Sequence, residues 1–305
     1  MNEYQVLEES YAKWVGKDYG VAVNSGTAAL HLSLLALGVG KGDEVIVPDF
    51  AFAAVAFAVT YCGATPVFVD CDENYNIDPE KIVITPKTKA IIAVHTYGRL
   101  CDMNRILAKA GKIPVIEDAC EAQGADVGKG TIVVFSFYKN KVLPGEEGGM
   151  ALLNDPEMYR RMHHLKNYAH QDKQYFHTEL GFNYRMPDAE ARLALKSFED
   201  RKEILAKRRV IEQLYISALG GKAHDSPWVF DMETDLIENA LDIHGTRCFF
   251  KPMSTFPIYN QTPCPNALRA SKKGFVVNLD HTKPLSEHLE TIQKIQLLAQ
   301  EVTFR

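Results

Sequence analysis

Short apolar runs alternate with helix-patterned stretches through the first half of the chain, and this alternation restricts the possible folds more than any other feature. Val21–Val23 precedes a turn and a helical run over Thr27–Leu37, and Glu44–Val47 precedes a helical run over Ala53–Cys62. Further strand-like runs are Pro66–Asp70, Ala90–Val94, Pro114–Asp118, Thr131–Phe137 and Gly149–Leu153, with a helix over Met103–Gly111. The alternation predicts an α/β fold with a mostly parallel sheet.

The second half of the chain has a different pattern. Apolar residues at helical spacing predict one long helix over Pro187–Leu219, and Gly220-Gly221 ends it. The rest mixes two strand-like pieces with two helices, over Trp228–Phe230, Arg247–Phe250, Thr234–His244 and Leu285–Glu301. We therefore expect a large α/β domain over residues 1–219 and a smaller α+β domain over residues 220–305.

Composition excludes several classes of protein. The 305 residues are 46% hydrophobic and carry a net charge of −5, so no nucleic-acid footprint is indicated. The six cysteines form no CxxC pair, which argues against a zinc site and a disulfide framework and fits reduced thiols in the cytoplasm. We expect no signal peptide, and no apolar run reaches the roughly 18 residues of a membrane span.

Lys141 lies in a segment that suits a reactive lysine. Four apolar residues, Ile132 to Phe135, indicate a buried strand, and a glycine-rich acidic turn ending at Gly149 follows the lysine. Burial disfavours the ammonium form of a lysine, and a neutral amine can form a Schiff base with an aldehyde cofactor. For a lysine taken alone, the ordinary alternative is a solvated loop residue.

The turn Ser25-Gly26-Thr27 lies between a strand and a helix. Backbone N–H groups at a helix N-terminus form an anion site, and Thr27 can add a hydroxyl. Ser136 could supply a second hydroxyl to the same phosphate group. The alternative is an ordinary helix cap.

Four further positions carry polar or aromatic groups beside predicted strands or helices. Asp118 ends an apolar strand, where a carboxylate can pair with a protonated pyridine nitrogen, or cap the next helix. Phe52 could stack on a planar cofactor or belong to the core. Asn183 and Arg185 lie in an apolar-aromatic turn before the long helix, where a solvated loop is the alternative.

Each motif alone is a weak signal, but together and in this order the motifs are specific for one protein family. The chain resembles the DegT/DnrJ/EryC1/StrS family of sugar aminotransferases, which are fold-type I enzymes dependent on pyridoxal 5'-phosphate (PLP). The matching segments are NSGTAALHLSLLALGVGKGDEVIVPDFAF, GATPVFVDCDENYNIDP, IEDACEAQGA, FSFYKNKVLPGEEGG and LGFNYRMPDAEA. The resemblance runs from about Tyr19 to Leu219 and more loosely beyond. It implies a mostly parallel seven-stranded sheet between helices, followed by a smaller C-terminal domain.

The resemblance also implies roles for individual residues. Lys141 would form the Schiff base and Asp118 would pair with the pyridine nitrogen, with Glu121 near the ring hydroxyl. The family places a serine five positions before its lysine and a Gly-Gly pair starting seven after it. Ser136 and Gly148 meet both spacings for Lys141, and Lys139 meets neither.

The phosphate-binding residues follow from the same resemblance. Gly26, Thr27 and Ser136 would hold the cofactor phosphate, with Ser25 in the same turn. Asn183 would reach the phosphate of the neighbouring subunit, because sites in this family are shared across a homodimer.

The implied reaction is a transamination. Glutamate would transfer its amino group to PLP, which becomes pyridoxamine 5'-phosphate (PMP), and Lys141 would act as general base and acid. A keto-sugar nucleotide would then accept the amino group from PMP, which gives ping-pong kinetics. The run FSFYKNK resembles most the members that aminate C4 of a 4-keto-6-deoxy sugar nucleotide, among them the perosamine synthases, which use a GDP-linked sugar.

Some features of the chain depart from the family pattern, and other activities are possible for a chain with this pattern. Only 20 residues precede Val21, the small domain is trimmed, and the stretch Lys251–Tyr259 lacks a histidine often found nearby, which bears on nucleotide contacts. A keto-sugar dehydratase of this family replaces the lysine with histidine, so Lys141 argues against it. A non-catalytic regulator with the PLP fold and an α/β binding protein without PLP are the remaining alternatives.

Overall fold

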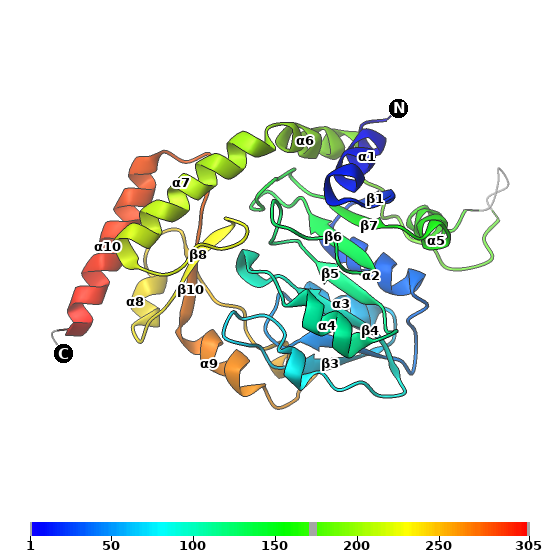
Figure 1. Ribbon diagram of the computed structural model, residues 1–305, viewed down its shortest axis with the longest axis horizontal. Coiled ribbons are helices and arrows are strands. Elements are labelled where there is room, and N and C mark those ends of the chain that lie inside the picture. Colours follow the sequence, from blue (N-terminus) through cyan, green and yellow to red (C-terminus); the bar gives the residue numbers. More distant parts are fainter. Residues whose placement is uncertain (1, 171–175, 304–305) are drawn as a thin grey trace.

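The computed structural model describes residues 2–170 and 176–303. The core of the large domain is a seven-stranded sheet in which five adjacent strands, up to one edge of the sheet, are parallel. One strand, β7, is antiparallel to both of its neighbours. In spatial order the strands are β1 (Tyr19–Val23), β7 (Gly149–Leu153), β6 (Ile132–Ser136), β5 (Val115–Asp118), β4 (Thr88–Val94), β2 (Glu44–Pro48) and β3 (Thr65–Val69) (Figure 1). The predicted α/β fold with a mostly parallel sheet is confirmed.

Helices cover both faces of this sheet because its strands are apolar on both sides. In β6, Ile132 and Val134 face one hydrophobic cluster, whereas Val133 and Phe135 face another. The first face is covered by α2 (Gly26–Ala36), α3 (Ala54–Tyr61) and α5 (Pro156–Lys166). The opposite face is covered by α1 (Glu3–Val15), α4 (Met103–Ala110) and α6 (Asp188–Glu199).

A second, smaller core lies around a three-stranded antiparallel sheet. Its strands are β8 (Val229–Glu233), β10 (Gly274–Asn278) and β9 (Thr246–Cys248), with β10 in the centre. The helices around it are α7 (Arg201–Leu219), α8 (Ile237–Leu241) and α10 (Leu285–Thr303). The predicted division between residues 219 and 220 stays a prediction, since α7 adds Ile211 and Tyr215 to this smaller core.

The single helix expected over Pro187–Leu219 was wrong. The chain forms α6 and then α7, and Asp200 separates them with a ψ angle of 3°. The carbonyl of Asp200 accepts the first hydrogen bonds of α7, from Glu203 and Ile204. Phe198 of α6 packs on the large-domain cluster, whereas α7 places Ile204 on that cluster and Ile211 and Tyr215 on the smaller core. Figure 1 shows α6 beside α1, and α7 running from there toward α10.

The helix expected over Thr234–His244 was too long. Only Ile237–Leu241 are helical, because the Thr234 hydroxyl accepts a hydrogen bond from the Leu236 N–H and forms a turn ahead of the helix. Among the described helices, none combines the length and the apolar character that crossing a membrane requires.

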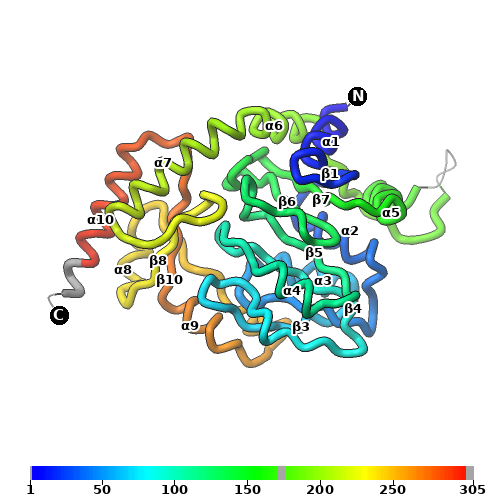
Figure 2. Tube along the Cα trace, in the orientation of Figure 1, coloured from blue at the N-terminus to red at the C-terminus, as the bar shows by residue number. Residues whose placement is uncertain are grey.

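After β9 the chain returns to the large domain before it completes the smaller sheet (Figure 2). This returning segment runs through a short 3-10 turn, Met253–Thr255, and α9 (Pro265–Lys273). Two buried carboxylates fix it: Asp49 accepts hydrogen bonds from Ser254 and Cys264, and Asp70 accepts them from the start of α9. Other 3-10 turns are Pro79–Lys81 and Thr96–Gly98.

Candidate active site

A cavity of about 460 Å³ lies where the large sheet meets the smaller domain. It lies at the carboxyl ends of the central strands, the usual position of ligand sites in open α/β sheets. All predicted site residues except Asn183 line it, namely Ser25, Gly26, Thr27, Phe52, Asp118, Glu121, Ser136 and Lys141. The fold therefore brings together residues that are more than a hundred positions apart in the sequence.

Lys141 projects into this cavity from the loop after β6. Its side chain is only 13% exposed, and its Nζ atom lies 4.0 Å from Glu121 Oε1 and 4.2 Å from the centroid of the Trp228 ring. Lys139 is exposed and does not line the cavity, and its Nζ lies over the ring of Tyr138. The two lysines, two positions apart, thus have different environments, and only Lys141 is placed for chemistry in the cavity.

Glu121 is the titratable neighbour of Lys141. Burial raises the pKa of Glu121 to about 7, and the charge of Lys141 opposes that shift only in part. Its Oε2 atom accepts a hydrogen bond of 2.7 Å from the Tyr97 backbone N–H. Near neutral pH this carboxyl can therefore hold or release a proton beside the lysine.

Asp118 is buried at the end of β5 and lines the cavity. Its Oδ1 accepts a hydrogen bond of 3.0 Å from the Cys120 backbone N–H, which fixes the carboxylate at the start of a turn. Residues 119–130 form no helix, so Asp118 does not cap a following helix. A buried carboxylate facing a cavity can pair with a cationic group of a ligand.

The N-terminus of α2 closes one end of the cavity. The Ser25 hydroxyl accepts a hydrogen bond from the Ala28 N–H and caps the helix. A Cβ atom on Gly26 would lie 3.0 Å from Ser136 Cβ, so glycine lets the helix end approach β6 closely. The first backbone N–H groups of a helix lack intrahelical partners and carry partial positive charge. With the Thr27 and Ser136 hydroxyls nearby, this end of the cavity suits a phosphate group.

Phe52 lies at the rim of the cavity rather than in the core. Its side chain is 60% exposed, and its ring centroid is 6.2 Å from that of Phe250. Asn183 is exposed and lies outside the cavity. It forms a bridge with Asn167, and its carbonyl accepts a hydrogen bond from the Asn24 side chain. Its reach toward a second subunit stays a prediction.

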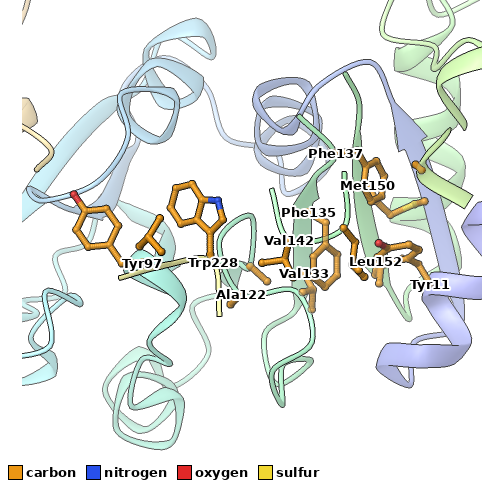
Figure 3. Close-up of a cluster of buried hydrophobic side chains, with 14 of the residues drawn as sticks. Tyr11, Tyr97, Ala122, Val133, Phe135, Phe137, Val142, Met150, Leu152 and Trp228 are labelled. Carbon is orange, nitrogen blue, oxygen red and sulfur yellow. The ribbon is translucent and has the colours of Figure 1, made fainter. Parts of the chain in front are cut away.

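Several cavity residues were not expected from the sequence. Trp228, Arg247 and Phe250, which come from the C-terminal part of the chain, also line the cavity. Trp228 lies in the buried cluster between Tyr97 and Ala122 (Figure 3). Their only signal in the sequence was the pair of strand-like aromatic runs to which they belong, because no spacing rule connects those runs with Lys141. The remaining new lining residues are Leu30, Ala54, Val55, Val94, Cys120, Tyr138, Asn140 and Glu147.

Comparisons with known proteins agree with this geometry. The model of the DegT/DnrJ/EryC1/StrS aminotransferase family matches residues 2–246. The GDP-perosamine synthase of Caulobacter vibrioides is 44% identical over 287 residues, which is 83% of this chain and 77% of that protein.

Two solved structures have similar folds. S. venezuelae DesV, in complex with a ketimine intermediate, has a TM-score of 0.89 and 29% identity over 98% of this chain and 90% of its own. Bacillus subtilis ntda with bound PMP has a TM-score of 0.89 and 26% identity over 98% of this chain and 78% of its own. On the family match and these likenesses, the chain belongs to the DegT/DnrJ/EryC1/StrS aminotransferase family.

Proposed function

We propose that the chain is a PLP-dependent aminotransferase that moves an amino group from glutamate to a keto-sugar nucleotide. The observation that carries the proposal is the position of the Lys141 amine, in a cavity between Glu121 and Trp228. Family membership supports the reaction class.

The residues around the cavity fit the cofactor. The N-terminus of α2, with the Thr27 and Ser136 hydroxyls, would hold its phosphate. Asp118 would pair with the ring nitrogen and favour its protonated form. The exposed ring of Phe52 at the rim would cover the pyridine. The tight approach of Gly26 to Ser136 supports this assignment, because a larger residue would fill the cradle.

The protein side chains would then control where protons go. When bound, PLP supplies an electron sink that stabilises negative charge on the carbon that loses its proton. Lys141 Nζ would carry that proton from the donor carbon to the bound cofactor, and in the second half-reaction it would carry a proton from the cofactor to the carbon of the keto sugar that accepts the amino group. The carboxyl of Glu121, 4.0 Å from the amine, would hold the amine in place when both groups are charged. Trp228 would exclude water from the amine.

We propose a 4-keto-6-deoxy sugar linked to GDP as the acceptor. The similarity to GDP-perosamine synthase supports this choice. We further propose a homodimer with shared sites, since Asn183 is exposed and free to face a second subunit. All six cysteines are free thiols, which supports a cytoplasmic location.

Two alanine variants test the assignment of the lysine. Both are loaded with PLP and assayed with glutamate and a panel of 4-keto and 3-keto sugar nucleotides, with the product identified by mass. Lys141→Ala is expected to lose turnover and the visible absorbance of the bound cofactor, whereas Lys139→Ala keeps both. Unchanged transamination by Lys141→Ala would contradict the proposal, and amination of a 3-keto sugar alone would contradict the choice of acceptor.

A further inference from the structure

We propose that Arg208 is a positioning residue that fixes Lys141 relative to Trp228. This inference rests on the proposed function of Lys141. Arg208 lies on α7, far in sequence from the lysine loop and outside the cavity lining. It touches neither the cavity nor any atom that would react, so its influence must pass through the residues that it holds.

The contacts of Arg208 are unusual for an arginine. Its side chain is only 2% exposed, and no carboxylate among the described residues forms an ion pair with it. Its NH2 group donates a hydrogen bond of 3.0 Å to the Lys141 carbonyl. Its NH1 group donates to the carbonyls of Leu279, at 2.8 Å, and Trp228, at 3.4 Å. The guanidinium thus connects the lysine loop with two segments of the smaller domain.

Burying this charge is costly, so the interaction needs a reason beyond packing. Burial lowers the pKa of Arg208 to about 10, which leaves the side chain charged at neutral pH. The charge of Asp280 opposes this shift without forming a salt bridge, so much of the cost of burying the charge remains. In addition, Nε of Arg208 has no hydrogen-bond partner among the described residues. The planar guanidinium presents its donors in a fixed fork, which a flexible lysine ammonium cannot do. That fork sets the separation of the carbonyls of Lys141 and Trp228.

The side chain of Trp228 makes a second connection to the same loop. Its Nε1–H donates a hydrogen bond of 2.7 Å to the Asn140 carbonyl, and its ring lies 4.2 Å from Lys141 Nζ. A cation close to an indole face is attracted by the ring. The lysine amine therefore meets the ring only while the backbones of residues 141 and 228 keep their spacing. Arg208 is the side chain that bonds both backbones at once.

A neighbouring arginine provides a matched control. Arg209, the next residue on α7, also donates to backbone carbonyls, those of His224 and Asp225. It makes no contact with the lysine loop. Arg208→Met and Arg209→Met therefore each remove a guanidinium from the same helix, but only the first frees Lys141 and Trp228. Arg208→Lys keeps the buried charge and removes the fork.

Fluorescence of the cofactor-free protein tests the inference without any activity. The chain has two tryptophans, so Trp14→Phe leaves Trp228 as the only one. In that background, Arg208→Met is expected to shift the emission of Trp228 to longer wavelength and to raise its quenching by acrylamide at least about twofold. Arg208→Lys should show the same change, and it provides the comparison if the methionine variant does not fold. Arg209→Met should leave the Trp228 signal unchanged.

Kinetics of the cofactor-loaded enzyme give the second measurement. Misplacement of a reacting group by about 1 Å can cost about 10²-fold in rate. Arg208→Lys is expected to lower kcat between about 10- and 100-fold, with KM for glutamate within about twofold of the parent. Unchanged Trp228 quenching in both Arg208 variants, or equal effects in Arg209→Met, would overturn the inference. If the parent chain does not transaminate, the proposed function fails, while the fluorescence comparison still decides the role of Arg208.

Discussion

At the scale of single residues, the protonation of Glu121 makes a prediction about stability. Its folded pKa of about 7 lies above its ordinary value of 4.5, so the folded protein binds this proton more tightly than the unfolded chain does. The stabilisation is complete below pH 4.5 and is lost as pH rises through 7. Glu121→Gln, which stays neutral, should therefore gain stability over the parent between pH 5 and 8, on the order of 2 kcal/mol.

Thermal melting of the cofactor-free protein at several pH values measures this difference. Glu147 is a matched control, because it lines the same cavity but is exposed. The melting temperature of Glu147→Gln should stay parallel to that of the parent across the range. A Glu121→Gln difference that is equally constant with pH would show that this carboxyl keeps its ordinary pKa.

Residues of the candidate site differ in how far the sequence could predict them. Ser25 and Lys141 follow strands and Asp118 ends one, all in local motifs that can be read directly from the chain. Arg208 and Trp228 reach the lysine only through the packing of the smaller domain. In the sequence, Arg208 resembles an exposed arginine in the middle of a helix. The residues next to it in the chain do not indicate that it forms a buried hydrogen bond with a loop 67 positions away.

At the scale of secondary-structure elements, the cap of α2 connects stability with the site. The Ser25 hydroxyl accepts a hydrogen bond of 3.1 Å from the Ala28 N–H at the helix end that faces the cavity. Ser25→Ala should reduce the free energy of unfolding by about 1 kcal/mol, the usual value for a lost N-cap. It should also weaken PLP binding, since the frayed turn carries the N–H groups proposed to hold the phosphate.

Urea denaturation and cofactor titration check these two effects separately. Asp102 caps α4 through a similar hydrogen bond of 3.1 Å to Arg105, away from the cavity. Asp102→Ala should lose a similar amount of stability and leave the PLP dissociation constant unchanged. Equal PLP affinities in the two variants would remove the N-terminus of α2 from the phosphate site.

The elements themselves were predicted best where the pattern is strongest. The seven strands of the large sheet all lie within about two residues of the apolar runs that indicate them. The separation of α6 from α7 could not be read from the sequence, because Asp200 is compatible with a continuous helix. The turn lets the chain pass from the large-domain cluster, which holds Phe198 and Ile204, to the smaller core, which holds Ile211 and Tyr215.

At the scale of the whole molecule, the segment that returns from the smaller domain joins the two cores, and Asp49 fixes it. Asp49 is fully buried, its Oδ1 accepts from the Ser254 N–H, and its Oδ2 accepts from the Ser254 hydroxyl and the Cys264 N–H. In Asp49→Asn one oxygen becomes an NH2 group, which would face the Cys264 N–H donor. We expect a loss of about 2 kcal/mol in the free energy of unfolding, the cost of a buried donor left without an acceptor.

Urea denaturation of the cofactor-free protein measures this loss, and Asp72→Asn is the matched control. Asp72 accepts hydrogen bonds through Oδ1 from Asn74 and Asn76 within its own turn, and an asparagine can keep both. Its variant should therefore lose less than about 1 kcal/mol. Equal losses in the two variants would mean that the returning segment is held by its apolar contacts and not by Asp49. A larger loss in Asp49→Asn would show that this one buried carboxylate fixes the returning segment to the large domain.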